Sequence, residues 1–142
     1  MASAELRASQ EYLGREEALR LLGSHLVGRI AVVVQGWPMI FPVNLHVLDS
    51  DTIVFRSEEV WRLTNPRCAI SMALEADGID AAGRLWSVVV TGAGREIVPV
   101  ERARLRDLGL ESPAGGHEDY WIQIRPETVT GRRFGWLEWS TA

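Results

Sequence analysis

The chain has 142 residues, which is enough for one ordinary domain around a single core. Its formal charge of −4 gives no global positive field that would gather nucleic acid or an anionic membrane. All fifteen basic residues are arginine, which excludes chemistry that needs a lysine amine, such as a pyridoxal Schiff base. We expect one domain over 1–142, with 1–12 a flexible N-terminal segment because they are polar and unpatterned.

Cysteine content and hydropathy bear on the compartment. The single cysteine, Cys68, cannot close an intrachain disulfide or build a multi-thiolate metal site, which fits a reducing compartment. No run approaches the ~20 apolar residues of a membrane span, and the first residues lack the secretory pattern. We expect a soluble cytoplasmic protein that binds neither nucleic acid nor membrane.

The first half of the chain changes from helical to strand texture. Residues 14–26 predict an amphipathic helix whose apolar face holds Ala18, Leu19, Leu22 and Leu26. β-Branched residues then predict a three-stranded meander, with turns at 35–36 and 49–51 and strands at 30–34, 39–47 and 52–55.

The next elements are a short helix, two strands and another helix. Ser57 is a suitable N-cap for a helix over 58–63, which Asn65-Pro66 would end. A strand over 68–74, a turn over 77–83, a long strand over 85–98 and a helix over 99–108 follow. Glycines at 92 and 94 predict a bulge or bend in the long strand.

After a Gly-rich loop, 120–125 alternates like a strand and 128–134 indicates another, before an aromatic tail. Six or seven strands with these turn signals favour a mainly β (α+β) antiparallel barrel over a doubly wound sheet. We expect the tail residues Phe134, Trp136 and Trp139 to pack against a partner subunit.

Familiar catalytic strings are missing: the chain has no P-loop, no G-x-G-x-x-G opening a helix, no H-E-x-x-H and no G-x-S-x-G. His25, His46 and His117 do not have metal-ligand spacing, and no metal site is predicted.

Six segments can be compared with known families by their order and spacing: 21–22, 27–31, 42–44, 54–57, 86–92 and 130–133. In order and spacing they resemble the pyridoxamine 5'-phosphate oxidase-like, FMN-binding split-barrel family, over about residues 13–134. The resemblance implies a six- to seven-stranded antiparallel Greek-key split barrel with an N-terminal helix and short peripheral helices. It also implies a homodimer with two equivalent interface clefts, each holding FMN or, in some branches, 8-hydroxy-5-deazaflavin. Members use the cofactor for two-electron redox chemistry on a small molecule.

The resemblance also implies cofactor-binding residues. The strand beside the isoalloxazine ring would contain Pro42, Val43 and Asn44, and the phosphate segment would contain Arg56, Ser57 and Arg62. Trp86 and Ser87 match an interface strand, and Arg132 and Arg133 match a turn that reaches the other subunit's cofactor. No side chain is predicted to be catalytic.

Purely structural roles remain open as alternatives for these residues. Val60 replaces the usual glycine, and Glu58 and Glu59 would repel a phosphate, so Arg56 and Arg62 could be ordinary salt-bridge partners. Core packing explains Trp86 equally well, and an exposed basic turn explains Arg132 and Arg133.

Three further alternatives concern the function. The first is a dimeric split-barrel binding or structural module that has lost tight cofactor binding. Haem, with His46 as the first candidate ligand, is less favoured. True pyridoxamine phosphate oxidase activity is also disfavoured, because the chain is short and the substrate-phosphate residues are not recognisable.

Overall fold

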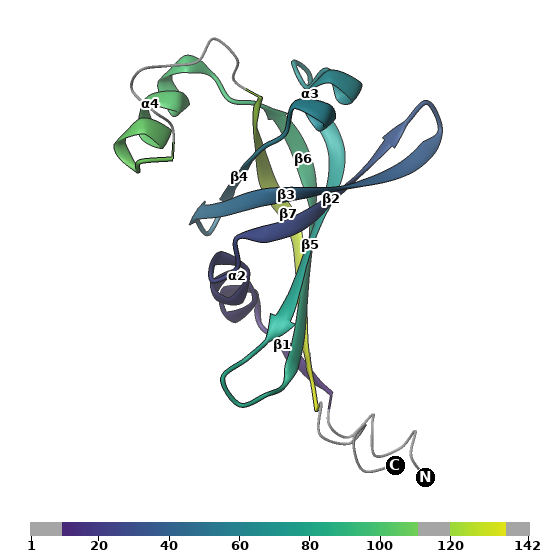
Figure 1. The fold of residues 1–142 in the computed structure, drawn as a ribbon, viewed down its shortest axis with the longest axis vertical. Coiled ribbons are helices and arrows are strands. Elements are labelled where there is room, and N and C mark those ends of the chain that lie inside the picture. Colours follow the sequence, from purple (N-terminus) through teal and green to yellow (C-terminus); the bar gives the residue numbers. More distant parts are fainter. Residues whose placement is uncertain (1–9, 111–119, 136–142) are drawn as a thin grey trace.

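The computed structural model describes residues 10–110 and 120–135. In this part of the chain, seven strands carry most of the fold and three helices pack around them (Figure 1). The strands are β1 (Glu11–Leu13), β2 (Val27–Val34), β3 (Trp37–Asp49), β4 (Thr52–Arg56), β5 (Ile70–Ile79), β6 (Leu85–Glu96) and β7 (Trp121–Phe134). The helices are α2 (Arg15–Gly23), α3 (Glu58–Thr64) and α4 (Pro99–Asp107).

The strands form a closed antiparallel ring. Their order is β1-β7-β4-β3-β2-β5-β6, and an additional β7–β6 pairing closes the sheet on itself, while β1 attaches to β7. Closure leaves β7 paired along its length with three neighbours and removes open edges from the main ring. The predicted antiparallel barrel is confirmed.

Strand alternation places one set of apolar side chains inside the ring. The largest buried cluster takes residues from β2 to β7, including Ile30, Leu45, Phe55, Leu74 and Val88, and α2 covers one end with Leu22. The meander β2-β3-β4 has the predicted connections, since Gln35 and Gly36 both adopt positive φ in a two-residue hairpin turn.

Helix α2 is shorter than predicted. Ala18, Leu19 and Leu22 are buried as expected, but the helix ends at Gly23, and Leu26 lies beyond it with 67% of its surface exposed. The backbone N–H of Ser24 bonds the carbonyl oxygens of Arg20 and Leu21, which closes the last turn. The predicted burial of Leu26 is therefore wrong.

Helix α3 has the predicted caps. The Ser57 hydroxyl accepts a hydrogen bond from the Val60 backbone N–H at 3.1 Å. At the other end Asn65 adopts a left-handed conformation with φ of 48° immediately before Pro66, so the helix cannot continue.

Three strand predictions need correction. β1 includes Glu11 and Tyr12, so the last residues of the predicted flexible segment are paired with β7. β5 continues to Ile79, through the first part of the predicted turn over 77–83. The two predicted C-terminal strands are one strand, because Pro126 lies opposite Gly92 where the β6–β7 register shifts and the missing proline N–H is tolerated.

A second, smaller apolar cluster lies outside the ring. Helix α4 packs Leu105 against the outer side of β4 and β7, where it meets Val54, Trp121 and Ile97. This cluster gives the barrel a covered outer patch, distinct from the main core. No helix within 10–110 and 120–135 is long and apolar enough to span a membrane.

Candidate functional site

The predicted ring strand and phosphate segment are neighbours on the outer side of the barrel. Asn44 on β3 pairs with Arg56 on β4, and both side chains are exposed. Pro42 is exposed on the same side, two residues before Asn44, whereas the intervening Val43 points into the core and is 5% exposed. Val43 can thus contribute backbone but no side chain to an outer site.

The predicted interface residues divide in the same way. Ser87 on β6 pairs with Arg132 on β7, and both lie on the outer side. Trp86 and Arg133 form the adjacent register pair, and both are buried. Alternation therefore leaves Ser87 and Arg132 available to a partner and places Trp86 and Arg133 in the protein interior.

The two outward groups lie in one row that crosses the barrel. Arg56 pairs with Asn44 and Asn44 with Val27 on β2, while Arg132 pairs with Ser87 and Ser87 with Asp77 on β5. Strands β2 and β5 are themselves paired. Asn44 and Ser87 are three strand spacings apart, about 14 Å along the surface, and Arg56 and Arg132 are five, about 24 Å. Within one chain these two groups do not meet.

The phosphate segment is partly engaged in contacts of its own. Arg62 donates from Nε to Oε1 of Glu58 at 2.9 Å and from a terminal nitrogen to the Tyr120 hydroxyl at 2.9 Å. The hydrogen bond to Glu58 is the main reason why the pKa of Arg62 is raised. The Arg62 guanidinium also lies over the Tyr120 ring, 5.4 Å from its centroid. For Arg62 the structure thus gives the salt-bridge role.

Arg133 lies in a network of ion pairs. Its guanidinium is 3.0 Å from Asp80, 3.3 Å from Glu17 and 3.5 Å from Glu11, and its side chain is 11% exposed. The network joins β7 to α2, to β1 and to the loop after β5. A hydrogen bond from Arg20, followed by one from Arg133, lowers the pKa of Glu17 to about 2.

Trp86 has the surroundings of a core residue. Its indole packs so closely on Gly78 that a Cβ there would come within 2.9 Å of the ring. The His25 ring meets the indole edge-on, with centroids 5.4 Å apart. The core role is the one that these contacts describe.

Comparison with known proteins shows the family to which this barrel belongs. The sequence model of the family described as pyridoxamine 5'-phosphate oxidase matches residues 14–133. The chain belongs to the pyridoxamine 5'-phosphate oxidase-like family. An uncharacterized protein of Mycobacterium tuberculosis is 34% identical over 126 residues, which cover 85% of this chain and 83% of the relative.

Solved structures share the split barrel of this family. A Corynebacterium glutamicum protein, whose name proposes a pyridoxamine 5'-phosphate oxidase, is 28% identical with a TM-score of 0.69, over 89% of this chain and 94% of that one. An FAD binding protein from Mycobacterium smegmatis is also 28% identical, with a TM-score of 0.64, over 89% of this chain and 99% of that one.

The outer face of this family member has features that sequence reasoning missed. Between the two groups of the row, Arg29 on β2 lies 2.8 Å from Glu75 and 3.4 Å from Asp77, both on β5. Partial burial raises the pKa of Glu75. Beside this charged cluster, Ile40 and Val33 expose 68% and 66% of their surface. Only the strand register, which the sequence does not state, brings these residues together.

The polar groups of the row have the hydrogen-bonding capacity that a flavin requires. A guanidinium (Arg56), a hydroxyl (Ser57) and an amide (Asn44) are adjacent, and all three groups can hydrogen-bond a phosphate or a pyrimidine edge. Pro42 and Val27 supply apolar surface for a ring. Glu58 and Glu59, both exposed in the first turn of α3, are the opposing feature.

His46, the residue considered for haem, is half-buried beside Trp121, with ring centroids 6.2 Å apart. Burial lowers its pKa. Cys68 is exposed. Within the described ranges no group of three or more His, Cys, Asp or Glu residues has the arrangement of a metal site.

Proposed function

We propose that the protein is a homodimer that binds a flavin in clefts between its two copies and acts as a flavin-dependent oxidoreductase on a small molecule. FMN is the flavin that the family resemblance implies, with 8-hydroxy-5-deazaflavin as the alternative. FAD is a further candidate cofactor because the Mycobacterium smegmatis relative is an FAD binding protein. The observation that carries the proposal is the single outward row with polar groups at both ends.

The spacing of the row supports a second copy. Asn44 and Arg56 are too far from Ser87 and Arg132 to hold the same phosphate or ring within one chain. A two-fold axis places the same face of both copies together, so the Asn44 end of one copy can meet the Arg132 end of the other. Two equivalent clefts then follow from symmetry.

The surface between the ends supports the same arrangement. Ile40, Val33 and Val27 are exposed apolar side chains on the outer side of the β2-β3 hairpin, and a second copy would remove them from water. The Arg29, Glu75 and Asp77 cluster carries both signs of charge, so it can meet its own image with opposite charges facing each other.

In this proposal the cofactor supplies the two-electron chemistry and the chain supplies binding and orientation. Arg56 and Ser57 hold the phosphate, and the Asn44 amide bonds the polar edge of the ring. Pro42 has no backbone N–H, so its edge of β3 leaves room for the ring face. Ser87 and Arg132 close the cleft from the second copy and exclude water.

The alternative is a dimeric split-barrel binding or structural module without tight flavin binding. Glu58, Glu59 and the Val60 side chain in place of glycine favour it, and so does the engagement of Arg62 by Glu58 and Tyr120. Haem is the least favoured ligand.

The test is a visible absorbance spectrum of the purified protein before and after addition of FMN or FAD, with dialysis to remove free ligand. We expect a retained flavin band, and at least a tenfold weaker affinity in Arg56→Ala because a charge-assisted phosphate contact is lost. The control is Arg106→Ala, on the exposed side of α4. Failure to retain FMN, FAD, deazaflavin or haem would leave the binding or structural module.

A further inference from the structure

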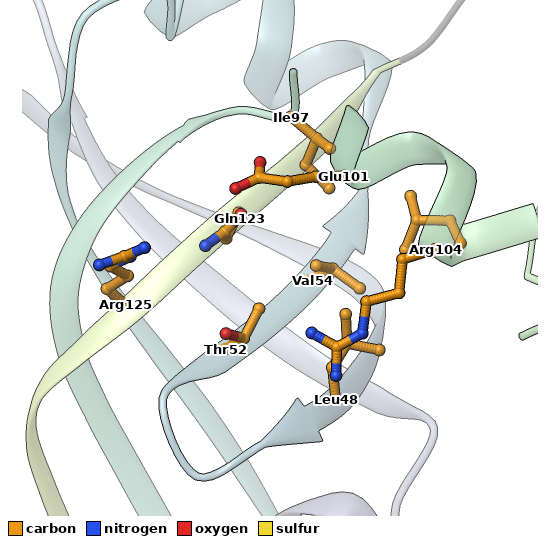
Figure 2. Close-up of a pocket in the computed structure, with 9 residues that line it drawn as sticks. Leu48, Thr52, Val54, Ile97, Glu101, Arg104, Gln123 and Arg125 are labelled. Carbon is orange, nitrogen blue, oxygen red and sulfur yellow. The ribbon is translucent and has the colours of Figure 1, made fainter. Parts of the chain in front are cut away.

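A cavity of about 170 Å³ lies under α4, on the outer side of β4 and β7 (Figure 2). Its apolar wall includes Val54 and Leu105, which are 1% and 0% exposed. Its polar lining comes from Gln123 and Arg125 on β7 and from Glu101 and Arg104 on α4. In Figure 2 the Glu101, Gln123 and Thr52 side chains border the same opening.

The cavity is separate from the proposed flavin site. Val54 lies opposite Gln123 in the β4–β7 ladder, whereas Arg56 lies opposite Trp121, two residues along. Trp121 packs into the cluster under α4 and faces the His46 ring. The Arg56 row and the row that lines the cavity are therefore neighbouring rows on the outer side of the barrel.

Gln123 is the first sign that the cavity is built for a polar ligand. Its side chain is buried, with the residue only 4% exposed. Its amide hydrogen-bonds no other described group, and its polar atoms are open to the cavity rather than enclosed by protein. Its NH₂ and carbonyl both border the cavity, so one donor and one acceptor await a partner.

Glu101 adds an acceptor without a partner. Its Oε1 accepts a hydrogen bond from Arg95 at 3.2 Å, whereas its Oε2 is buried and has no hydrogen-bond partner in the described structure. A buried carboxylate oxygen left unpaired costs free energy, so a ligand that brings a hydrogen-bond donor to it gains affinity.

The two arginines set the charge of the ligand. Arg104 is 3.2 Å from Asp49, and Glu101 is matched by Arg95, so these charges cancel in pairs. Arg125 has no carboxylate within ion-pair distance among the described residues. One positive charge is thus left over at the rim, which favours a monoanion, and a planar guanidinium matches a carboxylate.

The volume of the cavity limits the size of the ligand. An apolar cavity of about 150 Å³ accepts benzene, which has six non-hydrogen atoms. We infer that the cavity under α4 binds a small 2-hydroxy monocarboxylate of about six to eight non-hydrogen atoms. Its carboxylate accepts from Arg125 and Gln123, its hydroxyl donates to Oε2 of Glu101, and its short alkyl group contacts Val54 and Leu105.

The experiment is a titration of the full chain with L-lactate, followed by the side-chain amide signals of the ¹⁵N-labelled protein. The chain has three glutamines, Gln10, Gln35 and Gln123, and the variant Gln123→Leu assigns the third by removing its signal. We expect the Gln123 signal to shift and saturate with a Kd of about 1 mM, as for a ligand of this size.

Variants of the protein and analogues of lactate test the inferred contacts one at a time. Gln123→Leu and Arg125→Ala should each weaken lactate binding by about tenfold, read from backbone amide shifts, while Arg106→Ala should leave it unchanged. Propionate, which lacks the hydroxyl, should bind about three- to tenfold more weakly than lactate. L-Alanine, which has no net charge, should also bind more weakly than lactate.

Three results would overturn the inference. The first is the absence of a saturable shift in the millimolar range in a protein whose backbone spectrum shows it folded. The second is equal affinity of the wild type and both cavity variants. The third is equal affinity for lactate and propionate, which would remove Glu101 from the site and with it the hydroxy-acid assignment. A flavin titration on the same samples is read independently, since the inference does not need the cofactor.

Discussion

Nε of Arg133 lies 3.0 Å from Oδ2 of Asp80, and the two side chains are 11% and 13% exposed. The pair links β7 to the loop that joins β5 and β6, at the closing seam of the barrel. Arg132, the residue before Arg133, points to the other side of the strand and is exposed. Two consecutive arginines that the family resemblance treats together therefore have different roles.

We predict that Arg133→Ala lowers the melting temperature by several degrees. The change leaves Asp80 and Glu17 without their shared cation and opens space in a nearly closed site. Arg132→Ala is the matched control and should leave the melting temperature unchanged. Thermal unfolding followed by circular dichroism measures both, and equal shifts in the two variants would contradict the division of roles.

The same network should make stability depend on acid pH. The pKa of Glu17 falls from 4.5 to about 2 on folding, chiefly through Arg20, and backbone hydrogen bonds from Arg84 and Ala82 help to lower that of Asp80. A carboxyl whose folded pKa is depressed stabilises the fold above its unfolded pKa, and this contribution is lost as pH falls through the folded pKa.

We therefore expect the stability of the wild type to decline from about pH 5 towards pH 2. Glu17→Gln should flatten part of this decline, because the glutamine no longer titrates. Urea unfolding at a series of pH values provides the measurement. Glu16→Gln, a change at the neighbouring exposed residue, is the control, and a wild-type slope in Glu17→Gln would count against the assignment.

The bulge at Gly92 should not accept a side chain. A Cβ at this position would collide with the backbone carbonyl oxygen of Arg125, an atom that cannot turn away as a flexible side chain can. Gly92→Ala should cost about 1–3 kcal/mol of unfolding free energy. Gly14→Ala, where a Cβ meets nothing within 4 Å, should change it by less than about 0.5 kcal/mol. Chemical denaturation that fails to separate these two variants would show that β7 can shift away from β6.

The proposed dimer face can be tested at one exposed residue. Ile40→Asp would place a carboxylate where two copies meet, and we expect the dimer dissociation constant to rise at least tenfold. Val100→Asp is the control, since Val100 is 84% exposed on α4, on another part of the surface. Sedimentation velocity over a concentration range gives both constants. A wild type that is monomeric at every concentration would remove the dimer itself.

Local chemistry made much of the fold predictable. The Gln35-Gly36 turn, the Ser57 cap and the Asn65-Pro66 stop are decided by two to four neighbouring residues, so the sequence shows them directly. The error at Pro126 has the opposite origin. A proline argues against a continuous strand unless the ladder is bulged at that point. Here Glu127 is the extra residue on β7, and the β6 residues opposite the bulge, Thr91 and Gly92, are far away in sequence.

The candidate site was predictable only as far as residue identity. Alternation inside a strand separates Arg132 from Arg133 and Ser87 from Trp86, but the sequence does not say which of each pair faces out, because both faces of β6 and β7 carry mixed side chains. The cavity under α4 left no sequence signal, since Gln123 and Glu101 come from separate elements and only tertiary packing brings them to one opening.

The position of β7 in the ring also bears on how the protein is made. β7 pairs with β1, β4 and β6, all of which precede it in the chain, and its pairing of Arg133 with Glu11 spans almost the whole described sequence. During synthesis, the edges of β1, β4 and β6 that pair with β7 remain unpaired until β7 has been made. Such non-local closure slows folding and exposes strand edges to other chains. The protein should therefore depend on chaperones most in the interval between synthesis of β6 and synthesis of β7.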